Sequence, residues 1–197
     1  MLRGLGALAT LLSLGVALVA GRYLLPTASI PEVVATNTFR QPWLALHAVS
    51  AATALLTGPW QFLSTLRSHL PSLHRWTGRV YTAACVIGGT TGFVLALGAS
   101  TGLVSTAGFG LLAVTWTFCT VMGWQLAMGR DFIAHRRWMI RSFALTFAAV
   151  TLRLYLPIAP ALPVSFENAY RCISFLCWVP NLLLAELYLR QRRLQKA

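Results

Sequence analysis

The sequence predicts an all-α, polytopic membrane protein, a bundle of six transmembrane helices. Two observations predict this fold: 57% of the 197 residues are hydrophobic, and only 16 Lys and Arg and 4 Asp and Glu carry charge. So few polar side chains cannot cover the surface of a soluble globule. The charges also leave long apolar stretches between them, and a helix needs about 20 apolar residues to cross a bilayer. An ordinary soluble enzyme is therefore excluded.

The six expected spans follow one another with short connections. The first four lie in stretches that are largely free of charge, and the 50 uncharged residues at 80–129 hold two helices joined near residues 98–102. The last two are less pure, because the fifth contains Arg153 and the sixth contains Glu186. The first segment is too long for a signal peptide and is expected to stay as an anchor. The expected spans are about 4–25, 43–63, 76–97, 103–128, 138–158 and 169–189.

The distribution of basic residues predicts the orientation. If the chain starts inside, twelve of the sixteen Lys and Arg fall on inner segments and four on outer ones. Basic residues concentrate on the cytoplasmic side of membrane proteins. We therefore expect both termini in the cytoplasm. The inner residues are Arg3, Arg67, Arg75, Arg79, Arg130, Arg136, Arg137, Arg141, Arg190, Arg192, Arg193 and Lys196.

The number of expected spans and the placement of charge also limit the classes of function. Six spans leave no room for a soluble domain, so residues 1–197 are expected to form one membrane domain whose partner is the lipid bilayer. The net charge of +12 lies on loops and helix ends, which disfavours nucleic-acid binding. No Ser-His-Asp set, phosphate-binding glycine loop or paired-carboxylate site is present, so hydrolases and NTPases are disfavoured. Catalytic residues cannot be assigned, and whether the protein is an enzyme stays open.

Two expected helices carry small residues on one face. This spacing predicts either close helix packing or space for a flat cofactor. A histidine, His74 or His47, lies at the head of each face. The small residues are Ala84, Gly88, Gly92 and Ala96 on the third helix and Ala51, Ala54 and Gly58 on the second.

Two similar segments begin the third and fifth helices. Residues 73–81 (LHRWTGRVY) and 135–142 (HRRWMIRS) each hold a histidine and an Arg-Trp pair followed by arginine three residues later. Together with residues 58–62 (GPWQF) and Leu152-Arg153, they resemble a bacterial family of predicted membrane proteins, domain of unknown function 2306, over roughly residues 43–160. The resemblance implies a multipass membrane protein and no agreed activity. A weaker similarity is to transmembrane cytochromes b, in which histidines on neighbouring helices hold haem.

The leading functional hypothesis is a membrane redox protein that holds haem b between His74 and His135 at the cytoplasmic side. Axial ligation needs two imidazoles at equal depth on facing helices, and both histidines lie just before their helices. Gly78 would let the ring approach the backbone. The haem propionates would pair with inner arginines. These arginines are Arg75, Arg79, Arg136 and Arg141.

Two alternatives stay open. The same inner arginines concentrate positive charge that would bind an anionic small molecule or lipid headgroup. A zinc site made by His69, His74 and His135 is the least favoured, because no carboxylate partners accompany these histidines. No metal is therefore assigned.

Two charged positions inside the spans lead to structural predictions. Arg141 and Glu186 lie at similar depth near the inner face, and an intramembrane charge needs a partner, so they are expected to pair. Arg153 lies about 18 Å farther along the fifth helix, at 1.5 Å per residue. We expect it to line an outer polar cavity with His47, an access site for a ligand or for protons. The alternative is that Arg153 clamps Glu167 of the last outer loop.

Overall fold

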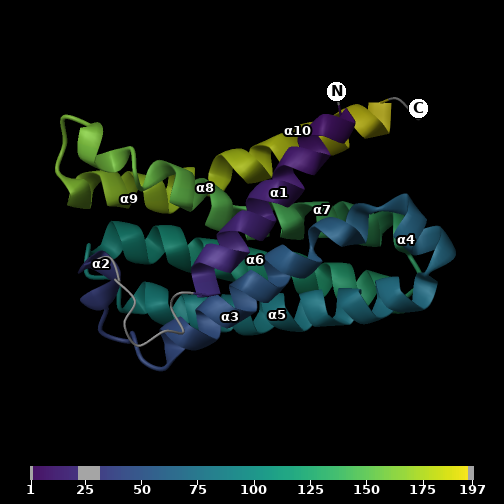
Figure 1. The fold of residues 1–197 in the computed structure, drawn as a ribbon, viewed down its shortest axis with the longest axis horizontal. Coiled ribbons are helices and arrows are strands. Elements are labelled where there is room, and N and C mark those ends of the chain that lie inside the picture. The colour runs from purple at the N-terminus through teal and green to yellow at the C-terminus, as the bar shows by residue number, and fades with distance from the viewer. Residues whose placement is uncertain (1, 22–31, 195–197) are drawn as a thin grey trace.

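The computed structural model describes residues 2–21 and 32–194, and this part of the chain contains helices and no strand (Figure 1). The long helices lie side by side as a bundle. The start of α1 and the end of α10 lie at the same end of the molecule. The α-helices are α1 (Leu2–Ala20), α2 (Glu32–Ala35), α3 (Trp43–Thr57), α4 (Ser64–His69), α5 (Pro71–Leu97), α6 (Leu103–Met128), α7 (Phe132–Thr146), α8 (Ala148–Tyr155), α9 (Phe166–Leu176) and α10 (Val179–Leu194), and the 3₁₀ helices are η2 (Pro59–Phe62) and η3 (Ala159–Ala161).

Three segments of the described chain are long and apolar enough to cross a membrane: α5, α6 and the α9–α10 segment Phe166–Arg192. The apolar part of α1, Gly6–Ala20, is shorter. The 50 uncharged residues at 80–129 form parts of two helices, α5 and α6, as expected. The turn between them contains Gly102 with φ +88°, a conformation that favours glycine. The fold is thus an all-helical one with membrane-spanning segments.

Three of the expected spans are interrupted. The second ends as a helix at Thr57 and continues as η2, because Pro59 has no N–H to donate along an α-helix. The fifth changes direction at Phe147, between α7 and α8. The sixth is divided into α9 and α10, with Pro180 in the first turn of α10, where its missing N–H has no cost. The uninterrupted helices are therefore shorter than the expected spans.

Small residues let neighbouring helices approach closely. A Cβ at Gly89 of α5 would lie 2.0 Å from Thr117 Oγ1 of α6, and a Cβ at Gly108 of α6 would lie 2.2 Å from Ser174 Oγ of α9. Such distances are far below van der Waals contact, so only glycine fits at these two positions. Close packing of this kind is the main attraction between helices in lipid, where apolar surface gains nothing from burial.

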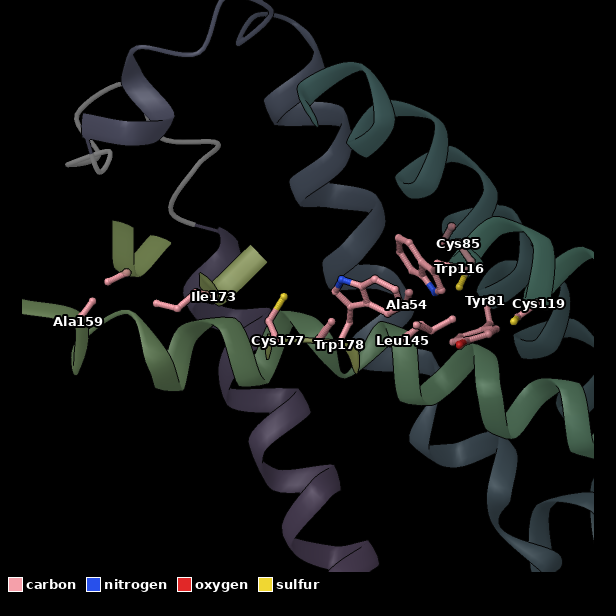
Figure 2. Close-up of a cluster of buried hydrophobic side chains, with 13 residues drawn as sticks. Ala54, Tyr81, Cys85, Trp116, Cys119, Leu145, Ala159, Ile173, Cys177 and Trp178 are labelled. Carbon is pink, nitrogen blue, oxygen red and sulfur yellow. The ribbon is translucent and has the colours of Figure 1, made fainter. Parts of the chain in front are cut away.

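A cluster of buried side chains joins α5, α6 and α7 to α9 and α10. Tyr81, Cys85 and Trp116 gather between the helices at one end of it, and Cys177 and Trp178 lie towards the other (Figure 2). Cys85 and Cys177 act as small apolar residues, whereas Cys172 is exposed. The four cysteines are free thiols.

The expected ion pair between Arg141 of α7 and Glu186 of α10 is confirmed. Arg141 Nε donates to Glu186 Oε1, and Arg141 Nη2 donates to Oε2 at 3.0 Å. The guanidinium also lies 4.8 Å above the ring of Trp138. A bidentate pair fixes the relative rotation of two helices, because both N–H···O bonds must stay in one plane. Estimating depth from helix position was sufficient to find this pair.

Candidate ligand cavity and histidine sites

A cavity of about 220 Å³ lies between α3, α5, α6 and α8. Its wall is largely apolar and includes Ala51 of α3, Leu112 of α6 and Leu152 of α8. Residues of α2 and of the α5–α6 turn line it as well, among them Val33 and Ser100, and Ser100 Oγ donates to Val33 O at 3.2 Å. Its lining includes the imidazole of His47 and the guanidinium of Arg153, together with the titratable side chains of Tyr170 and Cys177.

His47 is held in one orientation against α5. Its Nδ1 lies 2.8 Å from the carbonyl oxygen of Gly88, which only accepts, so Nδ1 carries the ring proton. A Cβ at Gly92 would lie 3.0 Å from His47 Cε1, and glycine at this position therefore makes room for the ring. Nε2 has no hydrogen-bond partner in the described chain, and the His47 side chain lines the cavity. His47 thus offers one acceptor to the cavity.

Arg153 brings positive charge to the same cavity. Its Nη1 donates to the carbonyl of Ala149 one turn earlier at 3.0 Å, and its guanidinium lies close enough to His47 for a direct electrostatic interaction. The structure therefore brings together the two residues expected to line the outer cavity. Glu167 is instead bound by Arg171, whose Nη2 lies 2.5 Å from Glu167 Oε1 at an exposed position. The clamp that the sequence suggested for Arg153 is thus made by another arginine.

A ring of buried hydroxyl groups forms one side of the cavity wall. Five contacts link Trp116 Nε1 to Thr146 Oγ1 (2.9 Å), Thr146 to Tyr81 (2.8 Å), Tyr81 to Ser142 (2.9 Å), Ser142 to Thr120 (2.7 Å) and Thr120 to the Trp116 carbonyl (2.8 Å). The indole can only donate and the carbonyl can only accept. The four hydroxyl protons then satisfy the other four contacts in one direction only.

That direction runs from Trp116 through Thr146, Tyr81, Ser142 and Thr120 and returns to Trp116. Thr146 Oγ1 also donates to the Ser142 carbonyl at 3.0 Å, so its proton is shared between Tyr81 and this carbonyl. Each group both donates and accepts, which strengthens the neighbouring bonds. The ring joins α5, α6 and α7 and leaves no proton to share with a ligand. Trp116 and Thr146 line the cavity, but their polar atoms are used inside the ring.

The two inner histidines also lie near each other. His74 interacts electrostatically with His135, and with Arg67 and Arg75. His135 Nδ1 lies 2.7 Å from the carbonyl of Gly123 in α6, so it carries the ring proton and leaves Nε2 as a free acceptor. His74 Nδ1, by contrast, is buried without a hydrogen-bond partner among the described residues. The His135 ring is therefore oriented by a hydrogen bond, whereas His74 Nδ1 has no hydrogen-bond partner among the described residues.

The arginines expected to hold haem propionates are partly engaged elsewhere. Arg75 Nη2 donates to Ser72 Oγ at 3.1 Å, and Arg79 lies 5.0 Å above the ring of Trp76. Arg141 is bound to Glu186, while Arg136 is exposed. Three of these four arginines thus have protein partners.

Gly78 does not offer an open face for a haem ring. A Cβ there would lie 3.3 Å from Gln61 Oε1, because the buried Gln61 side chain covers it and donates to Thr77 Oγ1 at 2.7 Å. Gln61 belongs to the segment 58–62 (GPWQF), but the sequence predicted no role for this residue. In the described residues, no group of three His, Cys, Asp or Glu side chains is placed to hold a metal ion. His69 Nδ1 is within hydrogen-bond distance of Ser68 Oγ and the Thr65 carbonyl, both in its own helix.

Sequence analysis also missed the hydroxyl ring. Ser142 and Thr146 lie four residues apart in an apolar helix, as do Trp116 and Thr120. Side chains with this spacing share one helix face, which was the available signal.

Comparison with known proteins identifies the family. The family model described as "Predicted membrane protein (DUF2306)" matches residues 44–189, and the chain belongs to this family. The matched region includes both histidine sites, the cavity-lining part of α3 and the Arg141–Glu186 pair. No curated protein and no solved structure matches the chain.

Proposed function

We propose that this DUF2306 protein crosses the bacterial cytoplasmic membrane six times, with both ends of the chain in the cytoplasm. The spans would be α1, α3 with η2, α5, α6, α7 with α8, and α9 with α10. This count is even, and it agrees with the position of the start of α1 and the end of α10 at one end of the bundle (Figure 1). It also agrees with twelve inner Lys and Arg against four outer ones.

Reporter fusions test this topology. A reporter that is active only in the periplasm should be active after Ser100 and after Leu162 and inactive after Gly129 and at the C-terminus. A fluorescent protein that matures only in the cytoplasm should give the opposite result at each site. If Gly129 and Leu162 report the same side, then α7 with α8 does not cross, and the six-span proposal is wrong.

For its activity, we propose that the protein binds a small, largely apolar molecule in the His47–Arg153 cavity. The observation that carries this proposal is an apolar cavity with a fixed imidazole acceptor and a guanidinium at its wall. A mostly apolar pocket with a few convergent polar groups is the usual form of a small-molecule site. Apolar cavities of roughly 150 Å³ bind benzene. At about 220 Å³, this one has space for one such ring and a small polar substituent.

The proposal can be tested by heavy-atom quenching of tryptophan fluorescence. Bromobenzene in the cavity should quench Trp116, which lines it, and the quenching should saturate in protein held in lipid nanodiscs. Trp116→Phe should remove the saturable component. Ala51→Phe, which fills the cavity, should do the same, whereas Val49→Phe on the exposed side of the same helix should not. Quenching that is linear in bromobenzene and equal in all four proteins would show partition into lipid and no site.

A second candidate function is electron transfer through haem b held by His74 and His135. The observations that favour it are the electrostatic effect of His135 on His74 and the hydrogen bond that His135 Nδ1 donates to a backbone carbonyl. Histidines that ligate metals usually donate their other N–H in this way. When bound, haem would supply one-electron chemistry, and the chain would orient it with these two imidazoles. The fit is incomplete, because Gln61 covers Gly78 and Glu186 binds Arg141.

The visible spectrum of the purified protein tests this candidate. Expression with sufficient haem should give a Soret band and reducible α and β bands, lost in His135→Ala and kept in the control variant His69→Ala. Absence of these bands would rule out haem b. The inner positive cluster would then remain as a site for an anionic headgroup or metabolite, since Arg67 and Arg75 both act on His74. Binding of anionic over zwitterionic lipid, reduced by Arg67→Gln, would support that alternative.

A further inference from the structure

The polar groups at the cavity wall specify a ligand more narrowly than its volume does. His47 Nε2 is an acceptor, because the ring proton lies on Nδ1 in the bond to Gly88. Arg153 is a donor that carries positive charge. The described lining contains no carboxylate that would favour a cationic ligand. The complementary molecule therefore donates one hydrogen bond to His47 and presents one acceptor oxygen to Arg153.

The hydroxyl groups near the cavity do not change this requirement. Thr146 and Trp116 use their polar atoms inside the hydroxyl ring. Ser100 donates to a backbone carbonyl. Asn37 uses its amide in bonds to Leu95 O and Phe39 N. The Tyr170 ring packs against Phe109 and Phe166. His47 and Arg153 supply the imidazole and the guanidinium of the described wall, and the charge of Arg153 acts electrostatically on His47.

We propose that the cavity binds a small apolar carboxylic acid, an inference that rests on the proposed ligand-binding function. One planar carboxyl group supplies both requirements: its O–H donates to His47 Nε2 and its second oxygen accepts from Arg153. If the acid arrives as its anion, one proton comes from solvent and is held in the bond to Nε2. The apolar body of the acid lies against Ala51, Leu112 and Leu152. An amine would meet the positive charge of Arg153, and a plain hydrocarbon would leave both polar groups without a ligand partner.

Three probes of equal ring size test this inference by saturable quenching of Trp116 in nanodiscs. They are 3-bromobenzoic acid, bromobenzene and 3-bromobenzylamine. The acid should bind at least tenfold more tightly than bromobenzene, and the amine should bind most weakly. If the probes only partitioned into the bilayer, bromobenzene would show the strongest quenching of the three. The expected order of affinities therefore cannot arise from partition. Arg153→Met should abolish the preference for the acid and keep bromobenzene binding, whereas Arg171→Gln, a control outside the described cavity lining, should leave both unchanged.

The outcomes separate this inference from the function on which it rests. Saturable binding of bromobenzene without preference for the acid would overturn the ligand class and leave the cavity site in place. No saturable binding of any probe would overturn both. Tighter binding of the amine would show that the wall favours a cation and contradict the role of Arg153. If Arg153→Met does not fold, the order of the three probes on the unmodified protein decides the question.

Discussion

The hydroxyl ring and the His47–Arg153 cavity share Trp116 and Thr146, but their polar groups are satisfied in different ways. In the ring, every hydroxyl donates and accepts, and Tyr81, Thr120, Ser142 and Thr146 are all at most 4% exposed. In the cavity, His47 Nε2 has no hydrogen-bond partner among the residues that the structure describes. The Arg141–Glu186 pair resembles the ring, because both charges are bound within the protein.

The difference separates polar groups that stabilise the bundle from polar groups that can recognise a ligand. A group inside a closed set of hydrogen bonds gains nothing from a ligand, and breaking the set costs stability. A group at the wall of a cavity can bind a ligand with little cost to the fold. Substitutions in the first class should therefore reduce stability, and those in the second should reduce binding. Three predictions test this distinction.

The largest loss of stability is expected for Glu186→Gln. It leaves Arg141, whose side chain is 16% exposed, without its carboxylate. Removing one partner of a fully buried pair costs about 3–5 kcal/mol. Because Glu186 is 34% exposed, we expect about 2 kcal/mol here. Equilibrium unfolding in mixed micelles measures this value.

Glu167→Gln is the matched control, since its pair with Arg171 is exposed and should contribute less than about 1 kcal/mol. Exchanging the charges, with Glu at 141 and Arg at 186, should recover part of the loss. Equal losses in both Gln variants, with no recovery on exchange, would show that the Arg141–Glu186 pair does not hold α7 and α10 together.

Tyr81→Phe should cost about 1–3 kcal/mol, because it removes one hydroxyl from the ring and leaves Ser142 and Thr146 with unmet hydrogen bonds. The aromatic ring is kept, so the loss reports on the hydroxyl alone.

Tyr188→Phe, which keeps the ring beside Arg192, should change stability by less than about 0.5 kcal/mol. Combining Tyr81→Phe with Thr120→Val should cost less than the sum of the two single losses. A strictly additive result would mean that the ring does not act as a unit.

Gly92→Ala should have the smallest effect on stability and a clear effect on binding. Its methyl group would lie 3.0 Å from His47 Cε1, so the ring must move away from Gly88. Overpacking of this kind costs about 1 kcal/mol or more, offset in part by a gain in helix propensity of roughly 0.5–1 kcal/mol. Binding of 3-bromobenzoic acid should fall, while bromobenzene binding is kept.

Gly110→Ala in α6 is the control, because its nearest neighbour lies 3.7 Å away, an ordinary contact. Gly110→Ala should gain stability from the higher helix propensity of alanine and leave the binding of both probes unchanged. Acid binding that is unchanged in Gly92→Ala would contradict the role given to the orientation of His47.

The sequence predicted the Arg141–Glu186 pair because depth in a membrane limits the partners of a charge. Each residue lies near the inner end of its helix, and rise per residue converts sequence position into depth. The same reasoning placed His47 and Arg153 at similar depth, and both line one cavity. Depth does not give the rotation of a residue about its helix axis. For this reason Glu167 stayed open as an alternative partner of Arg153, whereas the structure pairs Glu167 with Arg171.

Helix interruptions were harder to predict. Pro59 and Pro180 lie within two of the expected spans, and the structure ends α3 before Pro59 and begins α10 just before Pro180. A kink and a break differ only in whether neighbouring groups satisfy the freed carbonyls, and those neighbours come from other helices. The break at Phe147 has no proline or glycine to mark it.

By itself, the sequence determined that the chain is helical and belongs in a membrane, because 57% hydrophobic content and sparse charge permit no soluble surface, and lipid requires each backbone group to bond within its own helix. It also indicated a face of small residues on α5, through residues such as Gly88 and Gly92. Only the tertiary structure decided which side chains meet. The tautomer of His47, the direction of the hydroxyl ring and the shape of the cavity depend on carbonyls and hydroxyls of other helices, and the rotation and register of those helices are set by packing between segments far apart in the chain.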